Sequence, residues 1–205
     1  IKSPITTPGD YILTNNRIIK SILRRRSVSP KHLKEPAPSW DELIEIIGTA
    51  GAAPDHGRMA PVRFVLIPED ERESMATVFE SAAKVENKVL ASDYLEEIRL
   101  KAMNGAMLVA IIAYISELNI AVPPHEQWIS VGASLQNVLL ALESFGYKGK
   151  IVSGRRVRSN TMRQAFRLKP EEHLVGFVVM GTHSGTGRDY PRKHGHDLLS
   201  IWNSD

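Results

Sequence analysis

Apolar and polar positions along the chain predict a mixed α and β protein with several helices and a small sheet. Short apolar runs predict four strands, at residues 62–67, 108–115, 147–152 and 175–180. Apolar residues at helical spacing predict helices over residues 10–26, 39–51, 126–145 and 159–166, and a helix through 75–82 that is followed by a charged helical region to 103. The run at 108–115 is apolar throughout, which is typical of a central strand covered on both faces. The helix at 126–145 is polar almost nowhere, so we expect it to be buried.

Start and stop signals support these boundaries and indicate one domain. Asp10 is a candidate cap for the first helix, and Ser39 followed by Glu42 has the spacing of a capping box. We expect residues 1–9 to form an extended arm. We expect residues 183–205 to form a tail whose apolar end packs on its own domain or on a partner subunit. Since no linker or internal repeat divides the chain, we expect residues 1–205 to form a single domain.

Composition narrows the possible functions. The chain has 42% hydrophobic and 24% charged residues, enough for a substantial core, and no cysteine, which excludes disulfides and thiolate metal sites. A formal net charge of only +3 suits a single anionic ligand better than a long nucleic-acid backbone. The sequence shows neither a secretion signal nor an apolar run long enough to span a membrane, so we expect a cytoplasmic protein.

The stretch at residues 24–29, Arg-Arg-Arg-Ser-Val-Ser, is the strongest candidate binding site. Guanidinium groups offer a planar fork of donors that matches phosphate oxygens, and serine adds a short neutral donor. The alternative is a solvated basic helix end that faces the negative pole of its helix. The cluster alone favours this alternative, so its interpretation depends on the other motifs.

Three further features follow in order. The first is a loop at residues 52–61 that contains Ala-Pro-Asp-His, the second is the end of the long helix at 139–147, and the third is Lys-Ile-Val-Ser-Gly at 150–154 with the closing strand at 176–182. Together with the Arg-Arg-Ser cluster, this ordered set resembles the nitroreductase family of flavoproteins from about residue 18 to residue 182. It is most similar to the small-subunit subgroup with Arg-Arg-Ser and Pro-Asp-His motifs. The resemblance implies an α+β fold, a central mostly antiparallel sheet wrapped by helices, in an intimate homodimer with FMN at the subunit interface.

The resemblance also assigns cofactor-binding roles residue by residue. The implied FMN-binding residues are Arg25, Arg26, Ser27, Pro54, Asp55, His56, Ile151, Val152, Ser153 and Arg192. The first three match the motif that reaches the phosphate and the flavin ring, and the next three match a loop that reaches FMN from the partner subunit. His56 is also a candidate donor to flavin or substrate. Residues 151–153 match a segment that lies along the ring, and Arg192 or Lys193 is a candidate for a late basic residue at the phosphate.

Several positions depart from the family pattern. They are Ala52, Ala60, Val62, Arg63, Ile151 and Val152, where the family often carries arginine, tryptophan, histidine or glutamine. One cofactor contact and the substrate side of the pocket are therefore expected to differ.

The implied activity is transfer of a hydride from NAD(P)H through FMN to a nitroaromatic, a quinone or a similar electrophilic acceptor, with ping-pong kinetics and no catalytic side chain of its own. A second hypothesis is the same fold with another flavin reaction, of the dehalogenase or flavin-fragmenting type. A third is a basic nucleic-acid-binding domain that uses the arginines at 24–26 and 155–158. A metal enzyme is disfavoured because the histidines show no ligand spacing with carboxylates.

Overall fold

A computed structural model describes residues 16–86, 89–185 and 191–203. Four strands form one sheet in the order β1-β2-β4-β3, and every pairing between them is antiparallel. The strands are β1 (Val62–Ile67), β2 (Met107–Tyr114), β3 (Lys148–Val152) and β4 (Glu172–Gly181). All four lie where the apolar runs predicted them, and the sheet confirms the expected α+β class.

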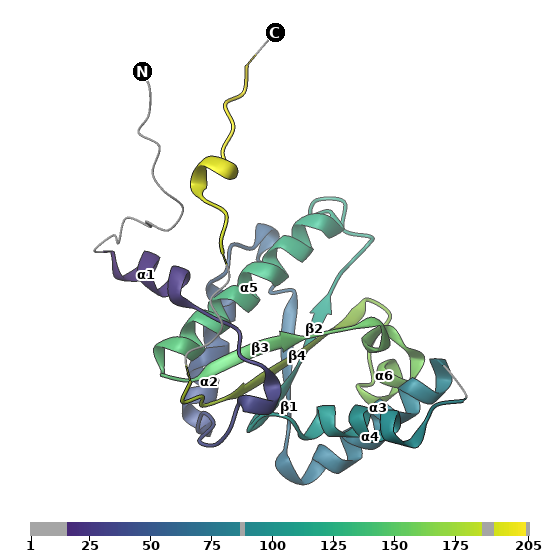
Figure 1. The fold of residues 1–205 in the computed structure, drawn as a ribbon. Coiled ribbons are helices and arrows are strands. Elements are labelled where there is room, and N and C mark those ends of the chain that lie inside the picture. Colours follow the sequence, from purple (N-terminus) through teal and green to yellow (C-terminus); the bar gives the residue numbers. More distant parts are fainter. Residues whose placement is uncertain (1–15, 87–88, 186–190, 204–205) are drawn as a thin grey trace.

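Helices cover both faces of this sheet (Figure 1). They are α1 (Arg17–Arg24), α2 (Trp40–Gly48), α3 (Arg72–Glu86), α4 (Ser92–Met103), α5 (Pro124–Ser144) and α6 (Asn160–Ala165). The described residues also form six short 3-10 helices: η1 (Pro30–His32), η2 (Thr49–Ala52), η3 (His56–Arg58), η4 (Glu69–Glu71), η5 (Arg155–Arg158) and η6 (Gly195–Asp197). Helices α2 and α5 lie on one side of the sheet, and α3, α4 and α6 on the other. None of the described helices is long and apolar enough to cross a membrane.

The central strand β2 contributes to two separate cores, as its uninterrupted apolar run predicted. Val109, Ile111 and Ala113 pack in the core beneath α2 and α5. The alternate residues Leu108, Ala110 and Ile112 pack in the core beneath α3 and α6. Because successive side chains of a strand point to opposite faces, both faces must be apolar to be covered in this way.

Capping side chains set two helix starts, one as expected and one not. The capping box of α2 is confirmed, since Glu42 N donates to Ser39 Oγ at 3.3 Å and Ser39 N donates to Glu42 Oε2 at 2.8 Å. The prediction of one helix from Asp10 is wrong, because Asn16 is extended and its side chain accepts from the backbone N–H groups of Ile18 and Ile19. Asp10 itself and the predicted arm at 1–9 lie outside the described residues.

The segment that follows α1 is held against the sheet. Val28 and Leu33 are buried in the core beneath α3 and α6. Lys34 N donates to Thr182 O at 3.0 Å, and Thr182 N donates back to Lys34 O at 2.8 Å. A Cβ on Gly181 would lie 2.7 Å from Lys34 O, so this approach requires glycine. The basic cluster at the end of α1 is thereby fixed relative to β4.

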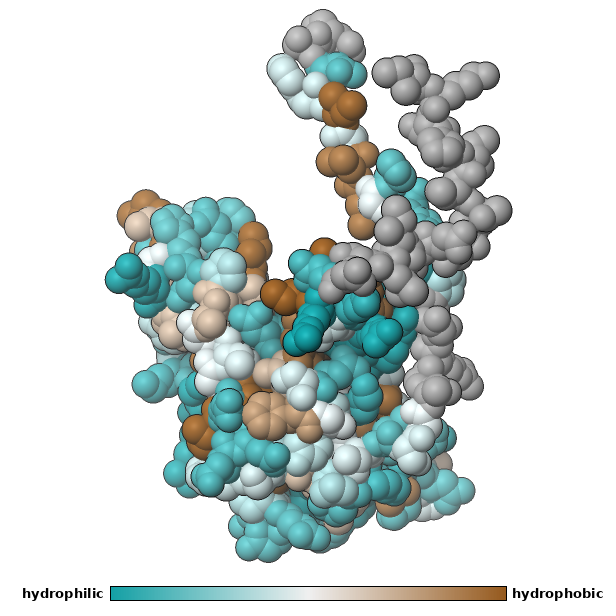
Figure 2. Space-filling view, turned by 90° about the vertical axis from the view of Figure 1, so that its left-hand side faces the viewer, coloured by the Kyte–Doolittle hydropathy of each residue, from teal (hydrophilic) through white to brown (hydrophobic). Residues whose placement is uncertain are grey.

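Two apolar surfaces remain exposed on the protomer. Helix α5 is not buried on all sides as expected, because Ile129 is 66% exposed and Trp128 also reaches solvent. The C-terminal tail projects from the body of the protomer (Figures 1 and 2). Its Ile201 and Trp202 are more than four-fifths exposed.

Candidate functional site

The basic cluster begins at the last turn of α1. The helix ends at Arg24, and Arg25 is its C-cap residue. Arg25 Nη1 donates to Ser27 Oγ at 3.3 Å, so a guanidinium and a hydroxyl already lie together. Among the described residues, neither Arg24 nor Arg25 is paired with a carboxylate. Arg26 turns back toward the helix end, where its Nη1 donates to Leu23 O and Arg25 O. The cluster is therefore a group of guanidiniums with capacity for an anion.

The tail brings a further cation to the same place. Arg192 Nη2 donates to Arg25 O at 2.9 Å, although 167 positions separate the two residues. Such a contact could not be read from the sequence, where the tail shows no spacing relation to α1. The arrangement places the Arg192 side chain beside Arg25, and a role of Arg192 at a phosphate stays a prediction.

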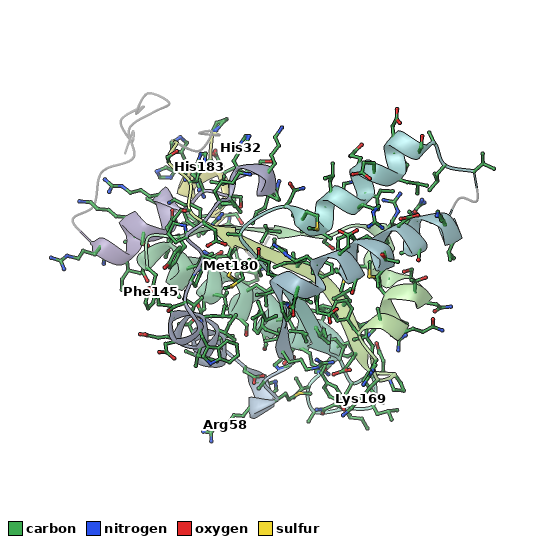
Figure 3. The ribbon with its side chains drawn as sticks, turned by 90° about the horizontal axis from the view of Figure 1, so that it is seen from below. His32, Arg58, Phe145, Lys169, Met180 and His183 are labelled. Atoms are coloured by element: carbon green, nitrogen blue, oxygen red, sulfur yellow. The ribbon has the colours of Figure 1, made fainter. Side chains whose placement is uncertain are left out.

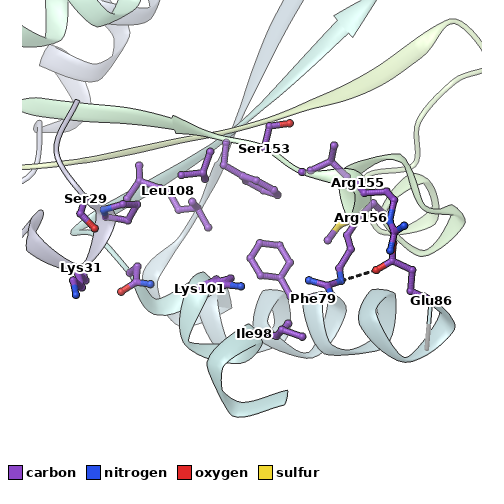
Figure 4. A pocket seen from close by; sticks show the side chains of 18 residues that line it. Ser29, Lys31, Phe79, Glu86, Ile98, Lys101, Leu108, Ser153, Arg155 and Arg156 are labelled. Atoms are coloured by element: carbon purple, nitrogen blue, oxygen red, sulfur yellow. Dashed lines mark hydrogen bonds and ion pairs between the residues drawn. The ribbon is translucent and has the colours of Figure 1, made fainter. Parts of the chain in front are cut away.

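A cavity of about 560 Å³ lies between the sheet and the α3 and α4 pair (Figure 4). Its walls are mostly apolar and include Phe79, Ile98, Leu108, Val152, Phe177 and Val179. Ser29, Pro30 and Lys31, which follow the basic cluster along the chain, line it as well. Its volume falls within the roughly 300–1,000 Å³ that is usual for small-molecule pockets. The cavity thus joins an apolar interior to a segment that leads from the arginines.

The end of β3 supplies another wall of the cavity. Val152 and Ser153 line it, whereas the side chain of Ile151 packs against the core on the α2 and α5 side. Ser153 Oγ donates to Val175 O at 2.6 Å, which fixes the hydroxyl while its oxygen stays able to accept. Of the three residues predicted in this segment, two therefore reach the cavity with their side chains and Ile151 does not.

The third wall of the cavity, on α3 and α4, could not be predicted from the sequence. Phe79 on α3 and Ile98 on α4 show only the periodicity of core residues, and nothing in the sequence indicates that they face a cavity. Phe79 meets Phe177 edge to face, with ring centroids 5.3 Å apart. The α3 and α4 pair therefore closes the cavity on the side away from the sheet.

An ion-pair network ties this wall to η5 at the rim. Glu86 accepts from Arg155 Nε, and its other oxygen lies 3.0 Å from Arg156 Nε. Arg156 Nη2 donates to the hydroxyl of Tyr94 on α4 at 2.8 Å. The hydrogen bond from Arg155 holds the pKa of the Glu86 carboxyl below its usual value. Because Arg155 and Arg156 are already paired, they offer little to a nucleic-acid backbone, which weakens that hypothesis.

The Pro54, Asp55 and His56 loop lies elsewhere in the protomer. Figure 3 shows Arg58 of η3 at the opposite end of the fold from His32 of η1. Ala60 N donates to Asp55 Oδ2 at 2.6 Å, which folds the loop back on itself. One protomer therefore does not bring this loop to the basic cluster or the cavity.

The protein class follows from comparison with known proteins. Residues 22–182 match the model described as the nitroreductase family. Two curated relatives are named "Putative NAD(P)H nitroreductase". The first, from Haemophilus influenzae, is 30% identical over 158 residues, which is 75% of this chain and 83% of the relative. The second, YdjA from Escherichia coli K12, is 30% identical over 80% of this chain and 87% of the relative. The chain belongs to the nitroreductase family.

Solved structures show the same fold at lower identity. A nitroreductase-like family protein from Bacillus cereus superposes with a TM-score of 0.75 at 18% identity, over 93% of this chain and 98% of that one. An FMN- and NADPH-dependent nitroreductase, NfnB, from a Sphigopyxis strain gives 0.70 at 16% identity, over 91% and 99%. An iodotyrosine deiodinase bound to FMN and 3-iodo-L-tyrosine gives 0.67 at 20% identity, over 92% and 100%.

Proposed function

We propose that the protein is an FMN-dependent oxidoreductase that takes a hydride from NAD(P)H and delivers it to an electrophilic acceptor such as a nitroaromatic or a quinone. The observation that carries this proposal is the apolar cavity reached by the segment after the Arg25 and Ser27 pair. The names of the curated relatives support NAD(P)H as the reductant. Two solved structures with this fold, the FMN- and NADPH-dependent nitroreductase and the deiodinase bound to FMN, support FMN as the cofactor.

The residues of this chain fit FMN by the chemistry of their donors. Arg25, Ser27 and Arg192 would hold the phosphate, since guanidinium and hydroxyl groups meet its oxygens with charge-assisted hydrogen bonds. The apolar walls at Val152 and Phe79 would receive the flat ring system and exclude water from it. FMN, when bound, supplies the hydride chemistry, while these residues bind and orient it. The reductant and the acceptor would use the same cavity in turn, which predicts ping-pong kinetics.

A homodimer completes the proposed site. The Pro54–His56 loop lies away from its own cavity, so it would serve the cavity of the partner subunit. The exposed apolar residues Ile18 on α1, Ile129 on α5 and Trp202 in the tail are the surfaces available for such an assembly. Size-exclusion chromatography with light scattering should give a dimer of the 22.8 kDa chain. A stable monomer that keeps full flavin affinity would contradict a site shared between subunits.

The deciding experiment is the visible absorption spectrum of the purified protein, before and after NADPH or NADH is added without oxygen. Yellow protein that bleaches supports the proposed reductase. Colourless protein that takes up no added FMN contradicts it. Yellow protein that stays yellow with both nucleotides would favour the alternative, a flavin protein of the same fold with another reaction. That alternative is tested because an iodotyrosine deiodinase has the same fold.

Replacing Arg25 by Ala tests the phosphate contact. We expect FMN affinity to fall by about tenfold to a hundredfold, since a hydrogen bond to a charged group contributes about 1.5–3 kcal/mol. Flavin fluorescence titration measures the dissociation constant. Arg17→Ala, at the other end of the same helix, is the matched control and should leave it unchanged. Equal affinities of Arg25→Ala and the parent protein would remove Arg25 from the site.

A further inference from the structure

The loop that carries His56 is held in a conformation that ordinary residues avoid. Gly57, Arg58 and Ala60 all have positive φ, at 79°, 52° and 46°. Left-handed backbone at two non-glycine residues costs free energy and persists only where surrounding contacts enforce it. One such contact is the hydrogen bond from Ala60 N to Asp55. The surroundings of the loop therefore determine where the His56 ring points.

The second contact comes from α5. His56 Nδ1 lies 2.6 Å from Glu126 Oε2, across 70 positions of sequence. Glu126 occupies the first turn of α5, where the positive pole of the helix favours a carboxylate. A carboxylate can only accept, so the proton of this short hydrogen bond belongs to Nδ1.

The start of α5 is anchored by its next residue. The Gln127 side chain is almost fully buried and bonds the preceding loop three times. Ser116 N donates to Gln127 Oε1 at 2.8 Å, while Gln127 Nε2 donates to Ser116 O at 2.9 Å and Val122 O at 2.7 Å. The η3 loop packs on the same segment, since Asn119 Nδ2 lies 3.4 Å from Met59 Sδ. These contacts hold the backbone at the start of α5 in place, and with it the position of Glu126.

We infer that Glu126 is a positioning residue that holds His56 in the tautomer with its proton on Nδ1 and turns Nε2 outward to meet a ligand. The side chain of His56 is 62% exposed, and within the described part of the chain its Nε2 has no hydrogen-bond partner. A fixed tautomer gives the outward nitrogen a defined role, because Nε2 accepts a proton in the neutral ring and donates it once the ring is protonated. The identity of that ligand, flavin or acceptor in the partner's cavity, rests on the proposed function.

The first test needs no cofactor. In ¹⁵N-labelled protein at about pH 8.5, where an ordinary imidazole is neutral, long-range ¹H–¹⁵N spectra distinguish the two ring nitrogens, and His56→Gln identifies the signal. We expect a protonated Nδ1 and an unprotonated Nε2 in the parent protein, and a tautomer mixture in Glu126→Ala. Glu117→Ala removes an exposed carboxylate from the loop that precedes α5 and should change nothing. A protonated Nε2 in the parent, or an unchanged signal in Glu126→Ala, overturns the inference.

The second test uses the FMN-loaded protein and a double variant. Positioned proton-transfer groups contribute about 10²–10⁴-fold, so loss of orientation should lower kcat/KM for the acceptor about tenfold in Glu126→Ala. FMN affinity should fall in the same variant where the ligand of Nε2 is the flavin, and stay within about twofold where the ligand is the acceptor. In a His56→Ala background, Glu126→Ala should not lower kcat/KM for the acceptor any further. A further loss of similar size overturns the inference. Failure to bind FMN would contradict the proposed function. The tautomer measurement, which needs no FMN, would then test the role of Glu126 by itself.

Discussion

The ion pair between Arg63 and Glu172 joins two strands that are not neighbours. Arg63 lies on β1 and Glu172 begins β4, with β2 between them in the sheet. Arg63 Nε donates to Glu172 Oε1 at 2.7 Å and Arg63 Nη2 donates to Oε2 at 3.1 Å. The carboxylate is 8% exposed and receives one further hydrogen bond, from Lys169 N at 2.9 Å. Replacing Arg63 by Gln would leave a nearly buried charge with that single partner.

The expected loss of stability is moderate. Breaking a fully buried pair costs about 3–5 kcal/mol. The Arg63 side chain is 46% exposed, however, and exposed pairs are worth only about 0–1 kcal/mol. We therefore expect the free energy of unfolding to fall by about 1.5 kcal/mol, between those limits. For a chain of this size, that lowers Tm by about 3–6 °C. Lys101→Gln, which breaks the exposed pair with Glu97, should change Tm by less than about 2 °C.

The pH dependence gives the sharper test. The hydrogen bond from Arg63 holds the pKa of the Glu172 carboxyl below its usual value of 4.5. A depressed pKa stabilises the fold above the unfolded pKa, and this contribution is lost as the pH falls through the folded pKa. Thermal unfolding should therefore show the full Tm difference between Arg63→Gln and the parent at pH 7. The difference should shrink below about pH 4. A difference of the same size at both pH values, or none at pH 7, would refute the reasoning.

Substitutions at three further positions test the packing and the helix capping of the fold. Leu142→Ala empties a fully buried position on α5 and should cost about 2–5 kcal/mol by urea unfolding, whereas a loss under 1 kcal/mol would mean that the core relaxes into the space. Ser39→Ala removes the capping box with Glu42 and should cost about 0.5–2 kcal/mol, but Ser39→Gly only a few tenths; equal losses would exclude capping as the cause. Gly181→Ala places a Cβ 2.7 Å from Lys34 O, so amide exchange at Lys34 should accelerate, and unchanged exchange would contradict this close approach.

The elements of the fold could be predicted because their signals are local. Apolar runs such as 108–115 locate strands, and the Ser39 and Glu42 spacing locates a helix start, because each depends on residues a few positions apart. The start of α1 was predicted too early because Asp10 and Asn16 are both acceptable caps. The sequence motifs also sufficed for the family, whose model covers residues 22–182. The cytoplasmic location stays a prediction.

By itself, the sequence determined the strands, most of the helices, the family and the candidate residues around Arg25. Only the tertiary structure decided which of them meet. It brought Arg192 to Arg25, kept Ile151 out of the cavity, and placed Phe79 of α3 in its wall. It also separated His56 from the cluster and paired it with Glu126. The physical reason is that cavities and ion pairs join residues whose separation along the chain carries no periodicity, so packing alone selects them.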